Sequence, residues 1–343
     1  MTILVTTKKV DLVIIGAGPV GLFAAFYARL RELNVVLIES LSIPGGQPQN
    51  LYPQKQILDV PGWLGLNGVE LTGNLVEQLQ QLQPEIYLDT TVIDVKNTDE
   101  AVLVETDRAI NFEADAILVA TGKGAFEPRR LDNELEQDFE NHGLYYFVPD
   151  LQQFKDKRVT ILGGGDSAVD LANQLVTVAK DVQLVHRRNN FRALEHTLLT
   201  LEQSNVKKLT PYVVQAINKN SDQTFNLELK ATRGEEIEHL TTDAIIVSYG
   251  FKSENKIVEG WSIKPAMSRQ KFAVDQNMRT SVPRVFAIGD AAEFEHKAEL
   301  IVTGFGDAPV AINTIIDQYI QNHQGVLHSS SVKIKDGQVQ SEK

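Results

Sequence analysis

Two stretches of the chain share one pattern of apolar and polar positions. In each, an apolar run ends in a glycine-rich turn, a segment of helical composition follows, and a second apolar run closes the pattern. Such a pattern is typical of a parallel βαβ unit. The first stretch predicts a strand over 10–15, a helix over 22–33 and a strand over 35–38, and the second predicts a strand over 158–162, a helix over 169–180 and a strand over 182–185.

A second repeated feature marks the end of each unit. Residues 114–122 and 242–250 are apolar runs that begin close to an Asp and end on a glycine. If each run carries the chain from one domain into the other, the first domain is interrupted by the second. We therefore predict an α/β protein with two Rossmann-like, three-layer dinucleotide-binding domains, in which residues 122–250 are inserted into a domain made of residues 1–121 and 251–343. Residues from about 325 form a C-terminal extension, whose polar end is expected to be frayed.

Composition limits the chemistry of the chain. Its 343 residues correspond to about two domains, and 43% hydrophobic with 23% charged residues is typical of a folded protein. The chain has no cysteine, which excludes disulfides, thiolate nucleophiles and cysteine-ligated zinc or iron–sulfur clusters. No metal site is expected.

Charge and hydropathy indicate the surroundings of the protein. The net charge of −12 disfavours nucleic acid and anionic membrane surfaces as partners. The uncharged run 12–28 is short for a membrane helix and carries glycines and a proline in its first half. The N-terminus lacks the features of a secretory signal. We therefore expect a cytoplasmic protein with no membrane contact.

Each glycine turn has the spacing of a dinucleotide-binding motif. The motif positions are Gly16, Gly18 and Gly21 in the first copy and Gly163, Gly165 and Ala168 in the second. The first glycine permits a tight turn, the second lets a pyrophosphate approach the backbone, and the third position packs the helix against the strand. One such motif alone can be an ordinary turn, but both copies lie between a predicted strand and a predicted helix. Two dinucleotide sites are therefore expected.

The residue that ends the second strand of each unit differs in charge. Glu39 and His186 stand at the same distance from the first glycine of their motifs. Glu39 suits a ribose with free hydroxyls, because a carboxylate accepts their hydrogen bonds and repels a 2′-phosphate. His186-Arg187-Arg188, with Arg192 beyond, offers cations for a 2′-phosphate and favours NADP over NAD. The alternative for this basic cluster is a solvated surface loop.

Three further motifs favour FAD at the first site. Gly45-Gly46-Gln47 exposes backbone near the expected pyrophosphate or flavin, and Asp290, after a short strand, could accept a hydrogen bond from a ribityl or ribose hydroxyl. The sequence 307–309 (Asp-Ala-Pro) predicts a helix that begins there, capped by its Asp. The N-terminus of that helix could stabilise a reduced flavin. Singly, each motif could be an ordinary turn or cap.

Taken in order, these motifs resemble the low-molecular-weight thioredoxin reductases. The motifs GxGxxG, Glu, GGQ, LYP, ATG, GGGDSAVD, HRRxxxRA, AIGDA and GFGDAP cover nearly the whole chain. The thiol branch of that fold carries a CxxC motif before the second nucleotide strand, and Tyr146 and Pro149 stand at those cysteine positions. The cysteine-free chain, with LYP at 51–53, GAFEPR at 124–129, YYF at 145–147 and LHSS at 327–330, is similar to the thioredoxin-reductase-like ferredoxin–NADP⁺ reductases.

The resemblance implies roles for individual residues. Tyr52 would stack on one face of the isoalloxazine ring and His328 of the partner subunit on the other, which implies a homodimer. From the residues alone, Tyr52 could be ordinary loop packing and His328 a solvated side chain. The residues that would hold FAD are Gly16, Gly18, Pro19, Gly21, Glu39, Gly46, Gln47, Tyr52, Val92, Phe126, Asp290 and Ser330. Those that would hold NADP(H) are Gly163, Gly165, Asp166, Ser167, Ala168, His186, Arg187, Arg188 and Arg192.

The expected activity is hydride transfer between NADP(H) and FAD and single-electron transfer between the flavin and ferredoxin or flavodoxin. The cofactors carry this chemistry, so no acid, base or nucleophile is required of the protein. One alternative is an NADPH oxidase or diaphorase of the same fold. Another is a non-enzymatic redox sensor that binds FAD and NADPH.

The net charge of −12 conflicts with an acidic carrier protein such as a ferredoxin. A local basic patch could override the repulsion. The alternative is that the cations are scattered and solvated. The candidates for such a patch are Lys252, Lys264, Arg269, Lys271, Arg279 and Arg284.

Overall fold

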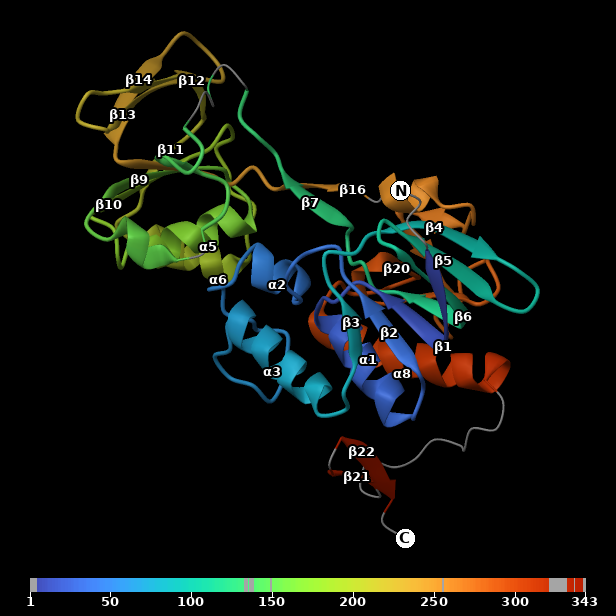
Figure 1. The fold of residues 1–343 in the computed structure, drawn as a ribbon. Coiled ribbons are helices and arrows are strands. Elements are labelled where there is room, and N and C mark those ends of the chain that lie inside the picture. Colours follow the sequence, from blue (N-terminus) through green and yellow to red (C-terminus); the bar gives the residue numbers. More distant parts are fainter. Residues whose placement is uncertain are drawn as a thin grey trace. The chain divides into compact units, whose positions relative to one another are not determined.

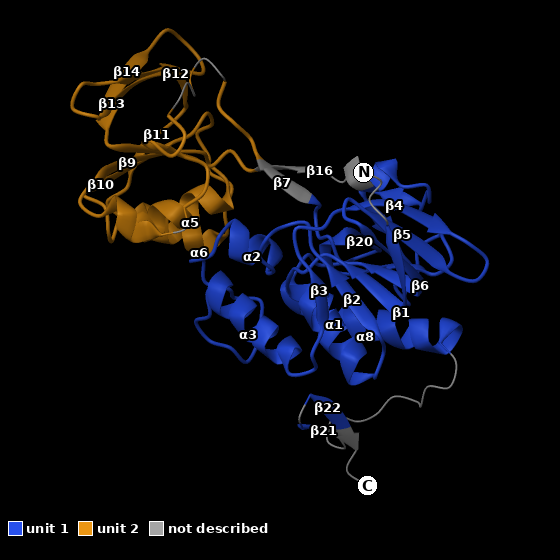
Figure 2. Ribbon diagram, viewed as in Figure 1, with its two compact units in different colours: residues 1–125, 253–343 blue, residues 126–252 orange. Residues whose placement is uncertain are grey.

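The chain folds into two compact units. The first comprises residues 1–125 and 253–343 and the second residues 126–252 (Figure 2). The chain passes between them twice, through β7 (Ala125–Pro128) and β16 (Phe251–Glu254), and these two strands pair with each other. The computed structural model describes residues 5–132, 135, 139–148, 150–254, 256–320, 332–335 and 337–341.

The first unit is built on a seven-stranded sheet of order β3-β2-β1-β6-β5-β4, with β19 also paired to β6 (Figure 1). Strands β1, β2, β3, β6 and β19 run parallel to one another. Strand β5 runs antiparallel to both of its neighbours, β6 and β4. The long β6 pairs with β5 through its first half and with β19 through its second half. The bounds are β1 (Thr6–Ile15), β2 (Val35–Ile38), β3 (Glu85–Tyr87), β4 (Val92–Asn97), β5 (Val102–Thr106), β6 (Ile110–Val119) and β19 (Val285–Ala287).

Both faces of this sheet are buried. Alternate side chains of a strand point to opposite faces, so Leu12 and Ile14 of β1 face one layer while Val13 and Ile15 face the other. The first layer is made by α1 (Pro19–Leu30), α3 (Gly68–Gln80) and α8 (Ile301–Tyr319). The second contains Trp261 and the small sheet of β17 (Met267–Ser268), β18 (Lys271–Ala273) and β20 (Ala292–Glu293). The unit therefore has three layers around the parallel strands.

Short elements complete the first unit. They are α2 (Gly46–Asn50), α7 (Lys256–Gly260) and the 3₁₀ helix η2 (Gly289–Ala291). The end of the C-terminal extension was expected to be frayed; within this extension, β21 (Val332–Lys335) and β22 (Gln338–Ser341) form an antiparallel hairpin. No helix among the described residues is long and apolar enough to span a bilayer.

The second unit repeats the parallel plan with five strands, in the order β11-β10-β9-β15-β8. One face carries α5 (Asp166–Leu175) and α6 (Glu195–Gln203), and the other carries an antiparallel sheet of three strands. The parallel strands are β8 (Leu144–Tyr145), β9 (Arg158–Leu162), β10 (Asp181–Val185), β11 (Lys207–Leu209) and β15 (Ala244–Val247). The antiparallel strands are β12 (Tyr212–Lys219), β13 (Phe225–Ala231) and β14 (Ile237–Thr242). A 3₁₀ helix, η1, spans Leu151–Phe154.

The helix of each βαβ unit begins earlier than its apolar periodicity predicted. Helix α1 starts at Pro19 rather than at residue 22, and α5 starts at Asp166 rather than at residue 169. Gly18 and Gly165 are the residues that precede the first turn, so each helix begins directly after the second motif glycine. A proline suits a first helical position, because its missing N–H has no intrahelical partner there. Both backbone N-termini therefore lie at the turn itself.

The prediction of a helix start at Asp307 was wrong. Helix α8 begins at Ile301, and Pro309 lies in its interior, where it forgoes one backbone hydrogen bond. The N-terminus is capped from a distant loop, because Asp59 Oδ2 accepts the Ile301 N–H at 2.5 Å. The local sequence of α8 contains no sign of this cap. The Asp307 carboxylate is therefore available for a different contact.

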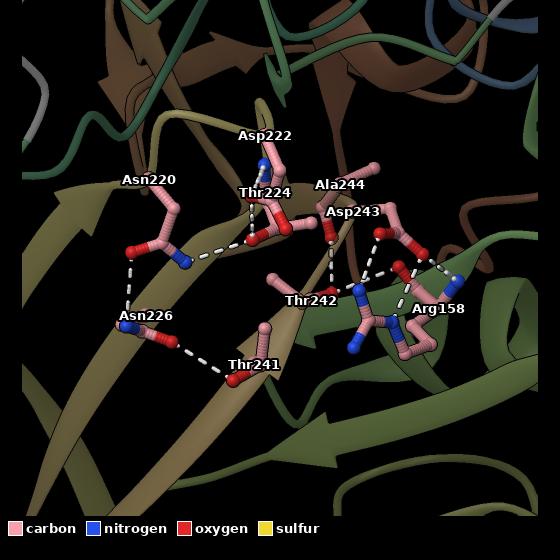
Figure 3. A network of polar contacts seen from close by, with 9 residues as sticks. All are labelled: Arg158, Asn220, Asp222, Thr224, Asn226, Thr241, Thr242, Asp243 and Ala244. Atoms are coloured by element: carbon pink, nitrogen blue, oxygen red, sulfur yellow. Dashed lines mark hydrogen bonds and ion pairs between the residues drawn. The ribbon is translucent and has the colours of Figure 1, made fainter.

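A polar network ties together the strands of the second unit (Figure 3). Asp243 accepts the backbone N–H of Arg158 at 2.7 Å and its guanidinium through Nη2 at 2.7 Å and Nε at 3.1 Å. These hydrogen bonds lower the pKa of Asp243. Thr242 Oγ1 donates to the Arg158 carbonyl. The start of β9, the strand that leads into the second glycine turn, is thereby fastened to the start of β15.

We predict that Gly21→Ala strongly destabilises the protein. A Cβ at Gly21 would lie 1.9 Å from the Gly16 carbonyl oxygen, so backbone must move. The free energy of unfolding in urea should fall by about 3 kcal/mol or more. Gly73→Ala is the matched control, because a Cβ there meets nothing within 4 Å in the exposed face of α3, and it should stabilise by about 0.5–1 kcal/mol. Equal effects of the two changes would refute the prediction.

Candidate active site

The first glycine turn connects β1 to α1 by close backbone packing. Gly16 has φ +104°, and a Cβ there would lie 2.6 Å from the Ala120 carbonyl oxygen. Gly21 packs directly on the Gly16 carbonyl. A Cβ on Gly18, in contrast, would meet only the Gly46 Cα, at 3.8 Å. A side chain at the second glycine of the motif would therefore make one ordinary van der Waals contact and clash with nothing.

Glu39 is fixed against this turn. It follows β2 and is 7% exposed. Its Oε2 accepts the Ala17 N–H at 2.8 Å, and its Oε1 accepts the Leu41 N–H at 3.0 Å. The carboxylate is thus held beside the second position of the glycine motif, where the sequence predicted a ribose contact.

The Gly45-Gly46 segment packs onto the same turn. The Gly45 N–H donates to the Ala17 carbonyl at 2.7 Å. Gly45 and Gly46 have φ values of +118° and +56°, and a Cβ on Gly46 would lie 2.9 Å from the Gly18 Cα. Both positions therefore require glycine. Gln47, half-buried at the start of α2, lies close to Gly122, in the middle of the loop between β6 and β7.

Tyr52 and Asp290, far apart in sequence, lie close together. Burial raises the pKa of the Tyr52 phenol, and the nearby carboxylates of Asp290 and Asp59 raise it further. The phenol is therefore protonated at neutral pH. Burial also raises the pKa of Asp290, and the ammonium of Lys123, 3.9 Å away, opposes that shift.

The sequence did not identify the charged residues that surround Asp290. Lys123 Nζ lies 2.7 Å from Glu299 Oε2, and Lys271 contacts the same carboxylate. These two cations lower the pKa of Glu299 to about 2. Lys123 directly follows the ATG motif, which is a signal that could have been used. Lys271 and Glu299 belong to separate segments, and no sequence pattern links them.

The second glycine turn repeats the packing of the first. A Cβ on Gly163 would lie 2.2 Å from the Ser248 carbonyl oxygen, just as one on Gly16 would approach Ala120. Ser248 follows β15 and Ala120 follows β6, so the two contacts are equivalent. A Cβ on Gly165 meets nothing within 4 Å. The side of Gly165 that faces away from the fold is therefore open.

His186 packs between this turn and Phe191. A Cβ on Gly164 would lie 2.3 Å from the His186 ring, and the ring stacks on Phe191 with centroids 5.6 Å apart. Burial, followed by the charges of Arg187 and Arg188, lowers the pKa of His186. The ring is therefore neutral at pH 7, and its Nε2 is buried without a hydrogen-bond partner.

The arginines of the basic segment are exposed. The segment returns to the glycine turn, because the Arg192 N–H donates to the Gly164 carbonyl at 2.8 Å and the Leu194 N–H donates to Asp166 Oδ1 at 3.2 Å. Arg187, Arg188 and Arg192 form no ion pair within the described part of the chain. They are therefore free cations at the rim of the turn.

The other residues expected at the sites lie in β4, in the first turn of α5, or among the side chains that are not described. Val92 begins β4 and is buried, and its carbonyl accepts the Trp261 indole N–H at 3.4 Å. Ser167 is exposed and Ala168 buried in the first turn of α5. Phe126 belongs to β7, but its side chain is outside the described part, as are His328 and Ser330.

The basic patch considered for the carrier is partly neutralised by carboxylates. Arg269 and Lys271 pair with Glu293, and Arg279 pairs with Asp275. The remaining described candidates, Lys264 and Arg284, donate to backbone carbonyls. The side chain of Lys252 is not described. The described candidates therefore do not form an unpaired basic surface.

Comparison with known proteins gives the family. The model of the pyridine nucleotide-disulphide oxidoreductases matches residues 10–314. A protein of Leuconostoc mesenteroides named ferredoxin–NADP reductase is 43% identical over 97% of this chain and 99% of its own length. The chain belongs to the ferredoxin–NADP reductases of this family. A protein of Streptococcus mutans with the same name is 44% identical over 94% of this chain and 96% of its own.

Solved structures agree with this placement. Thioredoxin reductase of Lactococcus lactis is 26% identical, with a TM-score of 0.76 over 92% of this chain and 100% of that one. Thioredoxin reductase of T. acidophilum, 22% identical with a TM-score of 0.77, shares the fold. Because this family member has no cysteine, it cannot use a protein dithiol. The predicted fold class and the predicted resemblance are both confirmed.

We predict a pH-dependent contribution of Glu299 to stability. A carboxyl whose pKa falls from 4.5 to about 2 on folding stabilises the protein above pH 4.5, and this stabilisation disappears as the pH falls toward 2. Because Glu299 is 42% exposed, Glu299→Gln should cost about 0.5–1 kcal/mol at pH 7. The difference from the unmodified protein in urea unfolding should shrink between pH 4.5 and pH 2.

The control for this measurement is Glu235→Gln. Glu235 is 94% exposed and lies 3.6 Å from Lys230. The Glu235→Gln substitution should change the free energy of unfolding little at pH 7 and at pH 2.5. A Glu299→Gln difference that stays constant from pH 7 to pH 2.5 would contradict the charge cluster.

Proposed function

We propose that the chain is an FAD-dependent ferredoxin–NADP reductase. It would transfer hydride between NADP(H) and flavin, and single electrons between flavin and ferredoxin or flavodoxin. One observation carries the cofactor assignment. Two glycine turns of equivalent packing are bordered by residues of opposite character, the Glu39 carboxylate at one and exposed arginines beside His186 at the other.

The first turn fits FAD. Gly18 and Gly46 pack together at the N-terminus of α1, where backbone N–H groups favour a pyrophosphate. Glu39 would accept a ribose hydroxyl with the acceptor capacity that its two N–H contacts leave unused. Asp290 and Gln47 would contact the remainder of the nucleotide. Pro19, Gly21, Val92, Phe126 and Ser330 belong to the same proposed set.

The second turn fits NADP(H). The open side of Gly165 lets a pyrophosphate approach the N-terminus of α5. Arg187, Arg188 and Arg192 supply unpaired guanidinium groups for a 2′-phosphate. The buried Nε2 of His186 is an orphaned polar atom that a nucleotide hydroxyl would satisfy. Gly163, Asp166, Ser167 and Ala168 shape this turn.

The protein would supply binding and exclusion of water. FAD, when bound, accepts hydride and releases electrons one at a time, so the chemistry is the cofactor's. Tyr52 presents a protonated phenol and therefore acts as an aromatic surface that shields the ring, with no acid or base role. Asp290 would hold a hydroxyl of the flavin side chain. His328 of the partner subunit is proposed for the opposite face.

The partner and location follow from the same proposal. A homodimer would let the C-terminal extension of one subunit, about 325–343, complete the flavin site of its partner. A small electron-carrier protein is the expected redox partner, in the cytoplasm, without nucleic acid or membrane. In this proposal residues 1–121 and 251–343 are the FAD domain and residues 122–250 the NADP domain.

We predict that Arg188→Ala weakens NADPH binding far more than NADH binding. Loss of one charge-assisted contact to a 2′-phosphate costs about 1.5–3 kcal/mol, or roughly tenfold to hundredfold in Kd. The Kd for NADH, which lacks that phosphate, should change less than about threefold. Titration calorimetry gives both constants. Arg233→Ala, an exposed arginine of the same unit, is the control, and equal losses for both nucleotides in Arg188→Ala would contradict the proposal.

The activity is tested by NADPH-driven reduction of cytochrome c, with and without added ferredoxin. The purified protein should be yellow, and its rate should rise strongly with ferredoxin, because the carrier and not the buried flavin would reduce cytochrome c. A rate that ignores ferredoxin, with oxygen consumed instead, would indicate an oxidase or diaphorase. Slow reduction of the bound flavin by saturating NADPH would favour a redox sensor.

A further inference from the structure

A buried ion pair lies directly behind the Gly289-Asp290 turn. Lys297 Nζ and Asp307 Oδ2 are 2.5 Å apart, and the two side chains are 2% and 8% exposed. The same Oδ2 accepts the Gly289 backbone N–H at 3.0 Å. One carboxylate oxygen therefore joins α8 to the loop before it and to the first residue of η2.

Stability alone does not account for this pair. Burying two opposite charges removes the hydration of both, and apolar side chains of similar volume would usually serve a core equally well or better. A pair of this kind is better explained by what it orients. Here the only backbone group that the carboxylate contacts, among the described residues, is the Gly289 N–H.

The Gly289 turn is confined on its other sides. Gly289 has φ +61°, and a Cβ there would lie 3.3 Å from Val20 of α1. A Cβ on Gly304 of α8 would lie 3.3 Å from the Gly289 Cα. The Ile288 N–H donates to the Val119 carbonyl at 3.0 Å. The Asp307 carboxylate thus accepts the backbone N–H of the turn residue that directly precedes Asp290.

Lys297 also acts on Asp290 through its charge. The ammonium lies under the Phe294 ring, 4.8 Å from its centroid. Its field, together with those of Lys123 and Lys271, lowers the pKa of Asp290 against the effect of burial. Lys297 therefore partly opposes the rise in the pKa of Asp290 that burial causes, while Asp307 holds the backbone of the preceding residue.

We propose that Lys297 and Asp307 are positioning residues that hold the Gly289-Asp290 turn for a hydroxyl of the flavin nucleotide. This inference rests on the proposed function, because it gives Asp290 its role. Neither residue touches the nucleotide in this proposal. Both act through Asp290, and that dependence can be measured.

The test is a double-mutant cycle on FAD retention. The Kd for FAD is measured by equilibrium dialysis of the holoenzyme for Lys297→Met, for Asp290→Asn and for the variant that carries both. Each single change should raise the Kd at least tenfold. Because Lys297 acts through Asp290, the double variant should bind within about threefold of the weaker single variant. The inference would be overturned if the increases in Kd of the two single variants multiplied in the double variant, or if Lys297→Met left the Kd for FAD unchanged.

Folding is controlled with two further variants. Lys297→Met leaves the Asp307 charge buried, so Lys297→Met/Asp307→Asn removes both charges and should recover the urea midpoint without recovering FAD affinity. Recovery of both would show that the pair is only structural. Lys8→Met breaks an ion pair of the same 2.5 Å distance between β1 and β3, with side chains 36% and 42% exposed, and should leave the Kd for FAD unchanged.

Failure of the proposed function would look different. In that case the unmodified protein would hold no FAD, or NADPH would not reduce its flavin. An unmodified protein that retains and reduces FAD, with a Kd insensitive to Lys297, would refute the positioning role alone.

Discussion

The structure depends on one steric constraint, the contact between a glycine after the first parallel strand and the carbonyl that follows the neighbouring strand. Gly16 meets Ala120 in this way and Gly163 meets Ser248. No side chain fits between them. The contact sets where each helix begins, because the chain must turn within three residues and then enter α1 or α5. It also places the N-terminal N–H groups of each helix at the carboxyl edge of its sheet, where a phosphate can reach them.

The two units apply this constraint in different electrostatic settings. In the first, Glu39 turns its carboxylate toward the glycine turn and is held there by backbone N–H groups. In the second, the equivalent His186 is kept neutral by burial and by its neighbouring arginines, whose side chains stay exposed. Two glycine turns with equivalent backbone packing are thus bordered by a carboxylate in the first unit and by arginine side chains in the second. The proposed assignment of FAD to the first turn and NADP(H) to the second rests on this difference.

The charged side chains close to the proposed flavin site occur in oppositely charged pairs. Lys123, Lys271 and Lys297 surround Asp290, and each is matched by a carboxylate. The net charge of −12 is therefore compatible with a locally balanced site. Carboxylates also neutralise Arg269, Lys271 and Arg279, three of the cations considered for a basic patch.

The sequence alone determined the two βαβ units, the inserted order of the segments, the glycine turns and the contrast between Glu39 and His186. These features are local, since each depends on residues within one strand, turn or helix. Tertiary structure decided the cap of α8 by Asp59, the contact of Asp307 with Gly289 and Lys297, and the cluster of charges around Asp290. Asp307 followed by Ala and Pro is a normal helix-start signal, but the helix begins at Ile301, whose N–H is capped by Asp59, 242 residues earlier in the sequence. Contacts between distant segments depend on how the layers pack, and no local pattern encodes that packing.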